Sequence, residues 1–277
     1  MYGHSHFSKR KGVPDFSLSK GGRPLVCLSL STVPMARLAD PHCDLILVGD
    51  SLGMVVYGMQ DTLSVSLQML SSHGRAVVQA TQKALIVIDM PFGSFEVSKE
   101  EAFKNAAHLL RETSAQAVKV EGGVEIADHI RFMVERGIPV MGHIGLMPQR
   151  KNSLGGFKIQ GKSTAAQKLI FDDMEAISGA GCFSIVIESV LEEIADQLTR
   201  LCPVPTIGIG ASNMCDGQIL VAADMLGLEA QTPPRFVKQY CTLHEEIDKA
   251  FSAYADEVKC RDFPTLKHTR SSKHTLK

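Results

Sequence analysis

The fold of this chain is indicated by the stretch Leu45-Ile46-Leu47-Val48-Gly49-Asp50, an apolar run that ends in a carboxylate. Four more short runs follow it, and each also ends in a charged or ionisable residue: Ala84-Leu85-Ile86-Val87-Ile88-Asp89, Ala117-Val118-Lys119-Val120-Glu121, Pro139-Val140-Met141-Gly142-His143 and Ser184-Ile185-Val186-Ile187-Glu188. Continuous apolar runs of this length are typical of parallel strands that are buried on both faces. We therefore expect an α/β protein with a parallel sheet.

Other stretches complete a pattern of alternating strands and helices. Residues 24–30 and 205–210 are predicted strands, and residues 219–221 are a weaker eighth. Amphipathic stretches of helical length lie between the strands, at residues 99–113, 124–136, 164–180 and 191–201. About eight repeats predict a (β/α)8 TIM barrel, with an open doubly wound sheet as the alternative.

The chain shows no break in composition that would indicate a linker between two large domains. We expect an N-terminal arm at residues 1–23, a single catalytic barrel domain at residues 24–263, and a basic, disordered tail at residues 264–277. Residues 235–259 have strong helical character and form an additional C-terminal segment. This segment could pack outside the barrel or on another subunit.

The composition is that of a globular protein. Of 277 residues, 44% are hydrophobic and 21% charged, and the net charge of −1 gives no electrostatic reason to expect a nucleic-acid or membrane partner. No apolar stretch is long enough to span a bilayer, and the first residues lack the apolar core of a signal peptide. Seven dispersed cysteines without a Cys-x-x-Cys pattern favour neither a disulfide framework nor a zinc site. We therefore expect a cytoplasmic protein.

The polar residues that end the strands form the candidate site. Parallel α/β proteins gather their chemistry at the carboxyl ends of the strands. Residues far apart in the sequence could thus converge on one pocket: Asp50, Asp89, Lys119, Glu121, His143 and Glu188. Carboxylates are the hard oxygen ligands that Mg²⁺ prefers, and histidine and cysteine are too few here to favour zinc. The sequence predicts a magnesium or manganese site on Asp50, Asp89 and Glu121.

Lys119 and Glu121 are two residues apart on one predicted strand, so their side chains share a face, which in a barrel is the interior. A buried lysine beside carboxylates is costly unless it meets an anion, and a substrate carboxylate could be that anion. Glu188, on a separate strand, would remain as a general base. The alternative is a buried ion-pair network that only caps the strands.

The segment Gly156-Phe157-Lys158-Ile159-Gln160-Gly161-Lys162-Ser163 matches the P-loop pattern G-x-x-x-x-G-K-[ST]. A P-loop follows a buried strand directly, whereas this segment follows the polar residues 149–153. We predict a mobile lid here and no nucleotide binding. The turn Gly208-Ile209-Gly210-Ala211-Ser212 could either receive an anion on its N–H groups or be only a tight turn.

Several motifs together resemble the ketopantoate hydroxymethyltransferase (3-methyl-2-oxobutanoate hydroxymethyltransferase) family over about residues 11–263. They are Leu47-Val48-Gly49-Asp50-Ser51-Leu52-Gly53-Met54, Asp89-Met90-Pro91-Phe92-Gly93-Ser94, Val118-Lys119-Val120-Glu121-Gly122-Gly123, Gly142-His143-Ile144-Gly145-Leu146 and Ile207-Gly208-Ile209-Gly210-Ala211 with Asp216-Gly217-Gln218. The resemblance implies a TIM barrel in a homo-oligomer, decameric in many bacterial members. It also implies Mg²⁺ and transfer of a hydroxymethyl group from 5,10-methylenetetrahydrofolate to 2-oxoisovalerate through a Mg-stabilised enolate, in pantothenate biosynthesis.

Position by position, the resemblance implies a role for each residue of the candidate site. The metal is expected on Asp50 and Asp89, with Glu121 close by and acting directly or through water. Ser51 and Lys119 are expected to bind the oxoacid, together with the two metal-binding aspartates. Glu188 matches the base and His143 a supporting polar position.

The chain departs from the family at the end of the first strand, where Ser29-Leu30-Ser31 replaces a Thr-Ala-Tyr type sequence, and at Phe157, where tyrosine is common. Two alternatives therefore stay open: a Mg-dependent oxoacid-enolate lyase or mutase of the related barrel group, and a catalytically weakened family member. The first would be expected to carry a cysteine in the mobile loop, and residues 149–163 contain none.

Overall fold

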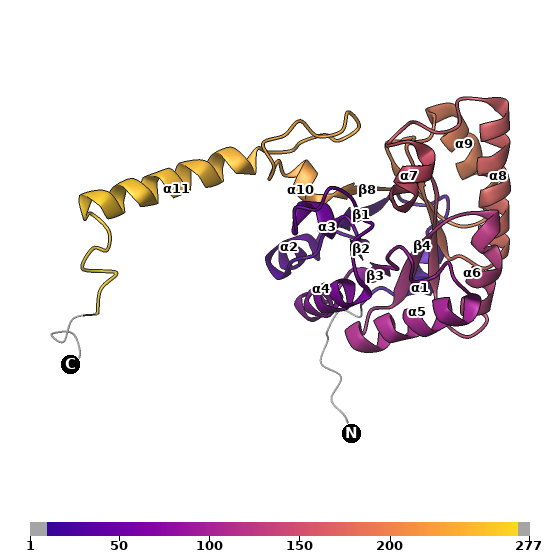
Figure 1. The fold of residues 1–277 in the computed structure, drawn as a ribbon, viewed down its shortest axis with the longest axis horizontal. Coiled ribbons are helices and arrows are strands. Elements are labelled where there is room, and N and C mark those ends of the chain that lie inside the picture. Colours follow the sequence, from indigo (N-terminus) through magenta and orange to yellow (C-terminus); the bar gives the residue numbers. More distant parts are fainter. Residues whose placement is uncertain (1–9, 271–277) are drawn as a thin grey trace, which may run out of the picture. The chain divides into compact units, whose positions relative to one another are not determined.

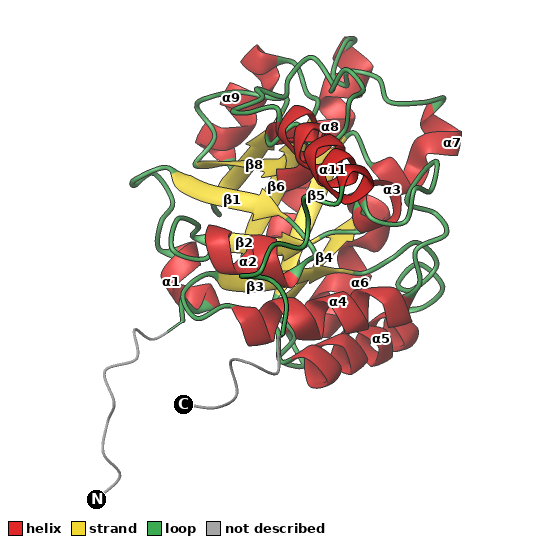
Figure 2. Cartoon of the chain, turned by 90° about the vertical axis from the view of Figure 1, so that its left-hand side faces the viewer, coloured by secondary structure: helices red, strands yellow, loops and turns green. Residues whose placement is uncertain are grey.

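The computed structural model describes residues 10–270, and its eight parallel strands close into a barrel in sequence order (Figures 1 and 2). β1 pairs with β2 on one side and with β8 on the other, so the sheet has no free edge. The strands are β1 (Leu25–Ser29), β2 (Leu45–Val48), β3 (Leu85–Asp89), β4 (Ala117–Glu121), β5 (Val140–Gly145), β6 (Ser184–Glu188), β7 (Thr206–Ile209) and β8 (Gly217–Val221). The predicted TIM barrel is confirmed, and the open doubly wound sheet is wrong.

Helices surround the strands, as Figure 2 shows with helices in red around yellow strands. Those that follow or separate the strands of residues 10–222 are α1 (Val13–Ser17), α2 (Val33–Ala39), α3 (Leu52–Val55), α4 (Leu67–Ala80), α5 (Lys99–Thr113), α6 (Ala127–Val134), α7 (Lys151–Leu154), α8 (Thr164–Gly179) and α9 (Glu192–Leu201), with 3₁₀ turns η1 (Val124–Ile126) and η2 (Pro148–Arg150). Two more helices, α10 (Ala222–Met225) and α11 (Leu243–Cys260), come after β8 in the sequence. The helices predicted between the strands are confirmed. Three of the long helices begin at a serine, Ser66, Ser98 or Ser163, whose hydroxyl accepts a hydrogen bond from a backbone N–H of the first turn.

Alternation along the strands divides the apolar core into two layers. One layer lies between the strands and the helices and includes Ile46, Val48, Ile86 and Ile88. The other fills the barrel and takes the alternate residues: Leu25, Cys27, Leu45, Leu47, Leu85, Val87, Ala117, Met141, Val186, Ile207 and Ile219. Because successive side chains in a strand point to opposite faces, the next residues in this second series are directed to the barrel interior.

Phe16, on α1 within the predicted arm, belongs to the interior layer. Its side chain is 1% exposed, and its ring packs edge-on against Phe183 with the centroids 5.9 Å apart. Phe16 thus adds apolar contact to the barrel interior. Residues 1–9 of the predicted arm lie outside the described residues.

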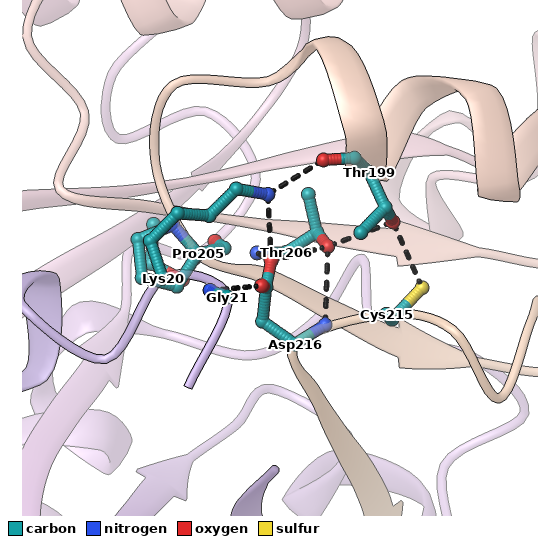
Figure 3. Close-up of polar contacts among 8 residues, drawn as sticks. Lys20, Gly21, Thr199, Pro205, Thr206, Cys215 and Asp216 are labelled. Atoms are coloured by element: carbon teal, nitrogen blue, oxygen red, sulfur yellow. Dashed lines mark hydrogen bonds and ion pairs between the residues drawn. The ribbon is translucent and has the colours of Figure 1, made fainter. Parts of the chain in front are cut away.

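A polar cluster around Asp216 joins segments at the end of the barrel where the strands begin (Figure 3). The carboxylate accepts hydrogen bonds from Lys20 Nζ (2.8 Å), the Gly21 N–H (2.8 Å) and the Thr206 N–H (2.8 Å) and hydroxyl (3.0 Å). Lys20 Nζ also donates to the Thr199 carbonyl at 2.6 Å. Asp216 therefore stabilises the barrel floor. This end of a TIM barrel contributes stability, whereas catalysis takes place at the other end.

Residues 223–277 form a second compact unit, separate from residues 1–222. Its main element is α11, which carries the large apolar residues Ile247, Phe251, Tyr254 and Val258 and has no buried residue within the described chain. Residues 271–277 of the predicted basic tail lie outside the described residues. Among residues 10–270, no helix is both long and apolar enough to cross a membrane.

Candidate active site

The barrel interior becomes polar at the carboxyl ends of the strands. Asp89, Lys119, Glu121, His143 and Glu188 each continue the inward-facing series of their strand, two or four residues beyond an apolar interior residue. The first four are almost completely buried, and the side chain of Glu188 is 15% exposed. All six residues predicted to converge, including Asp50 two residues after β2, therefore lie in or just after the carboxyl-terminal half of their strands, at the same mouth.

Gly49 makes room for this site. A Cβ atom added to Gly49 would lie 2.7 Å from Ser29 Oγ and 3.2 Å from both Asp89 Oδ2 and Ser51 Oγ. A side chain at this position would therefore occupy the space between the polar groups of β1, β2 and β3. The glycine is needed for close approach of these groups and not for an unusual backbone angle.

Asp50, Asp89 and Lys119 are held together by direct contacts. The backbone N–H of Asp50 donates to Asp89 Oδ2 at 3.0 Å, and Lys119 Nζ donates to Asp89 Oδ1. Lys119 Nζ also lies 3.9 Å from Glu121 Oε1. Lys119 therefore links Asp89 on β3 to Glu121 on β4. Lys119 and Glu121 lie on the same face of β4, as expected from their spacing.

The site holds more acidic than basic groups. Burial and the Asp89 carboxylate raise the pKa of Asp50 to about 7. Burial also raises the pKa of Glu121 well above its ordinary value, although Lys119 opposes the shift. Burial alone would lower the pKa of Lys119, but the carboxylates of Asp89, Glu121 and Asp50 raise it instead. One ammonium group does not balance three buried carboxylates, so additional positive charge would stabilise their ionised forms.

His143 lies between two carboxylates from different strands. Its Nδ1 is 3.6 Å from Glu121 Oε1 and its Nε2 is 3.4 Å from Glu188 Oε2. Neither ring nitrogen has a hydrogen-bond partner among the described residues at normal distance and angle. The ring therefore connects the cluster around Lys119 with Glu188, which is the most exposed acid of the site.

Gln149, which the sequence did not single out, lies in the middle of the carboxylates. Its side-chain Nε2 donates to Asp50 Oδ2 (2.8 Å) and to the Met90 carbonyl (3.0 Å), and its backbone N–H donates to Glu121 Oε2 (3.0 Å). The residue is 4% exposed. Its sequence context, a polar stretch after β5, gave no signal of this role.

A second group missed by the sequence lies beside the end of β1. His73, on α4, donates from Nδ1 to the Ser31 carbonyl at 2.6 Å, since a carbonyl can only accept. Its Nε2 then accepts from the Tyr57 hydroxyl at 3.0 Å. The hydroxyl of Ser51 lies 3.2 Å from that of Ser29. An aromatic hydroxyl is thus linked to Ser31, near the Ser29-Leu30-Ser31 departure, but it comes from a different segment.

The P-loop-like segment does not have the context that a P-loop requires. It lies between α7 and α8, well after the end of β5, and Ser163 serves as the N-cap of α8. Gly155 and Gly156 both adopt positive φ angles, at which glycine is favoured. The turn after β7 has Gly210 at φ +57°, and the Ser212 hydroxyl donates to Asp196, which places an acidic group beside that turn.

The chain matches the sequence profile described as ketopantoate hydroxymethyltransferase over residues 11–266. The chain belongs to this family. Two relatives bear the name 3-methyl-2-oxobutanoate hydroxymethyltransferase: one from Rhizobium etli, 52% identical over 261 residues (94% of this chain and 96% of the relative), and one from Brucella canis, 51% identical over 254 residues (92% of each).

Solved structures with a similar fold belong to other enzymes. Phosphonopyruvate hydrolase, solved with oxalate and Mg²⁺, has a TM-score of 0.57 at 11% identity and covers 90% of this chain and 89% of its own. 2,3-Dimethylmalate lyase has a TM-score of 0.56 at 13% identity, with 93% and 90% covered. At this identity the likeness concerns the fold alone, which is the barrel expected for a ketopantoate hydroxymethyltransferase.

The residues present fit a cation that is held by few protein ligands. Among residues 10–270, no group of three or more histidine, cysteine or acidic side chains forms a ready metal site. Mg²⁺ commonly uses only one or two carboxylates and takes its other ligands from water and substrate. Asp89 supplies one such carboxylate beside the space that the missing Cβ of Gly49 leaves, and Asp50, close enough for the Asp89 charge to raise its pKa, supplies a second. The donor set and its excess of acidic groups therefore suit Mg²⁺ or Mn²⁺ better than zinc.

Proposed function

We propose that this chain transfers a hydroxymethyl group from 5,10-methylenetetrahydrofolate to 2-oxoisovalerate, which yields ketopantoate in pantothenate biosynthesis. The observation that carries the proposal is the match to relatives of this name at about half identity over nearly the whole chain. The mouth of the barrel supports it, because three carboxylates and a lysine line the interior where a small 2-oxoacid would bind. Its substrates are therefore small molecules.

Lys119 and Ser51 are proposed to bind the carboxylate of the oxoacid. The ammonium group of Lys119 is buried among acids, so an anion placed near it gains a charge-assisted hydrogen bond without displacing bulk water. Ser51 precedes α3 and presents its hydroxyl toward Ser29. Ser51 borders the space beside Gly49, and both residues lie close to Asp89, which Lys119 contacts directly.

Asp50 and Asp89 are proposed to hold a divalent cation, with Mg²⁺ as the metal and Glu121 close by. When bound, such an ion would polarise the 2-oxo group and stabilise negative charge on its oxygen by several kcal/mol. The protein's part is to keep the two carboxylates apart and oriented, which it does through the Asp50 N–H, Lys119 and Gln149.

Glu188 is proposed as the base that removes the proton from C3 of the oxoacid. Its carboxylate is the one least involved with Lys119, and it is open enough to meet a substrate. His143 is proposed as a supporting polar group, with its Nε2 3.4 Å from Glu188 Oε2. A placed base of this kind contributes roughly a 10²–10⁴-fold rate factor. The C3 carbanion equivalent then bonds to the one-carbon unit of the folate, and water supplies the hydroxyl oxygen. Both carbon–nitrogen bonds of that unit break, and tetrahydrofolate leaves with the proton taken from C3 and one proton of the water on its two nitrogens.

The test is formation of ketopantoate from 2-oxoisovalerate and methylenetetrahydrofolate with added Mg²⁺. Activity that EDTA abolishes and Mg²⁺ restores is expected, and turnover by metal-free protein would contradict the proposed role of the carboxylates. Cleavage of a phosphonate or a dialkylmalate without hydroxymethyl transfer would instead favour the lyase or mutase alternative. The low identity to those enzymes does not favour it.

We also propose that the protein is a cytoplasmic homo-oligomer, decameric as in many members of the family. The support is the second unit, in which α11 presents large apolar side chains and has no buried residue within the described chain. Light scattering of the purified protein measures the oligomer directly. A monodisperse monomer at micromolar concentration would contradict this part of the proposal.

A further inference from the structure

Gln149 connects the ends of three strands through one side chain and one backbone group. Its Nε2 bonds to Asp50 after β2 and to the Met90 carbonyl after β3, and its backbone N–H bonds to Glu121 at the end of β4. Both protons of the amide nitrogen are thus directed at oxygen acceptors. The opposite orientation of the amide would place its oxygen against these acceptors, so the network selects a single orientation.

The oxygen atom of the same amide lacks a partner. Gln149 Oε1 is buried and has no hydrogen-bond partner among the described residues. A buried polar atom without a partner costs free energy, and such atoms in native proteins commonly mark functional sites. Gln149 bonds to Asp50 and to Glu121, so its unpartnered oxygen belongs to a residue of the proposed cation site.

The residues after Gln149 also bond to other segments at the mouth of the barrel. Arg150 pairs with Glu125, which follows β4, and Lys151 Nζ lies 3.3 Å from Asp61 Oδ2, in the segment that follows α3. At the other end of the segment, the Gln160 N–H donates to the Ser189 carbonyl at 2.7 Å, directly after Glu188. Residues 151–159 are therefore anchored on the carboxylates at one end and beside Glu188 at the other.

We propose that Gln149 is a positioning residue that couples the ordering of residues 151–159 to cation binding at Asp50 and Asp89. This inference rests on the cation site of the proposed function. The amide bond to Asp50 Oδ2 restricts the orientation of that carboxylate, which lowers the ordering cost of ion binding. Such coupling is reciprocal. An ion that favours this orientation of Asp50 therefore also favours the hydrogen bond from Gln149 and, with it, the ordered form of residues 151–159.

The first test measures binding of Mn²⁺ alone to the substrate-free protein by electron paramagnetic resonance. Gln149→Met keeps the length of the side chain and removes both amide groups. Loss of an outer partner of a metal ligand typically weakens metal affinity about 10–100-fold, and we expect at least about tenfold here. Gln160→Met is the matched control, since the Gln160 side chain donates to the Lys158 carbonyl on the surface, and its Mn²⁺ affinity should equal that of the wild type.

The second test uses hydrogen–deuterium exchange and does not depend on activity, and its wild-type measurement does not depend on the folding of a variant. In the wild type, Mn²⁺ should slow amide exchange in residues 151–159, and in Gln149→Met this slowing should be lost. Equal Mn²⁺ affinity of wild type and Gln149→Met would overturn the inference. Wild-type protein that binds Mn²⁺ with no change in exchange would overturn it as well, while leaving the cation site intact. Wild-type protein that binds no Mn²⁺ would overturn both the cation site and this inference.

Discussion

Replacement of Gly49 by alanine tests whether close packing at the mouth positions the reacting groups. The new methyl group would lie 2.7 Å from Ser29 Oγ and 3.2 Å from Asp89 Oδ2, distances shorter than ordinary carbon–oxygen contacts. Ser29 can rotate its hydroxyl away, but Asp89 is held by the Asp50 N–H and by Lys119. The strain must therefore be shared by the carboxylate pair proposed to hold the cation.

Two magnitudes follow from this geometry. Overpacking a dense interior costs about 1–3 kcal/mol of stability. A shift of a few tenths of an ångström in Asp89 and Ser51 should reduce kcat/KM by roughly 3–10-fold, since a displacement of about 1 Å can cost 10²-fold. The activity should thus fall by much more than the loss of stability alone explains.

The assay compares ketopantoate formation and urea unfolding for Gly49→Ala and two further proteins. Gly179→Ala is the matched control, because nothing lies within 4 Å of a Cβ added at this last residue of α8. It should retain full activity and gain about 0.5–1 kcal/mol of stability. Adding Ser29→Ala to Gly49→Ala removes the closest clashing atom and should recover part of the activity. Wild-type kcat/KM and Mg²⁺ dependence in Gly49→Ala would refute the packing argument.

Three further predictions concern other parts of the molecule. Asp216→Ala should lower the free energy of unfolding by about 2–4 kcal/mol in urea titrations, because it leaves Lys20 and two N–H groups without their acceptor. Burial alone would raise the pKa of Asp216, but Lys20 and the N–H groups lower it overall. The stability that the ionised Asp216 contributes should thus be complete above about pH 4, and it should be lost as the pH falls through the pKa of Asp216 in the folded protein. This pH dependence should be absent in Asp216→Asn. Glu188→Gln should keep Mg²⁺ binding yet slow exchange of the C3 hydrogen of 2-oxoisovalerate in D₂O by about a hundredfold, whereas loss of exchange only in His143→Ala would make His143 the base. ATP should show no micromolar binding that Lys162→Ala abolishes.

The strands were predictable because burial on both faces leaves a continuous apolar signature. β2, β3 and β6 have this signature in full, whereas β8 reads Gly217-Gln218-Ile219-Leu220-Val221 and was the weakest prediction. Gln218 is exposed, so the pattern there is interrupted. The long helix α4 was not singled out from its sequence, although Ser66 precedes it and acts as its N-cap. The signal was present in that capping residue.

The motif Asp216-Gly217-Gln218 shows the limit of a resemblance. It helped to indicate the family, but its position in the sequence did not reveal which end of the barrel it occupies. The structure places Asp216 before β8, where it bonds to Lys20 and Thr206 on the barrel floor. Strand direction alone separates this structural acid from the acids at the mouth, and direction becomes visible only when the strand boundaries are known.

The strands determine the side-chain direction of some residues of the candidate site but not of others. Asp89, Lys119 and Glu121 follow the interior series of their strands, so alternation is enough to direct them inward. Asp50 falls one residue after the interior position that Gly49 occupies, and its strand does not direct its side chain to the interior. Its orientation comes from the Asp89 carboxylate at its backbone and from Gln149 at its side chain. The acid most conspicuous in the sequence is therefore positioned by a loop residue that no strand pattern could indicate, which is why Gln149 became apparent only from the structure.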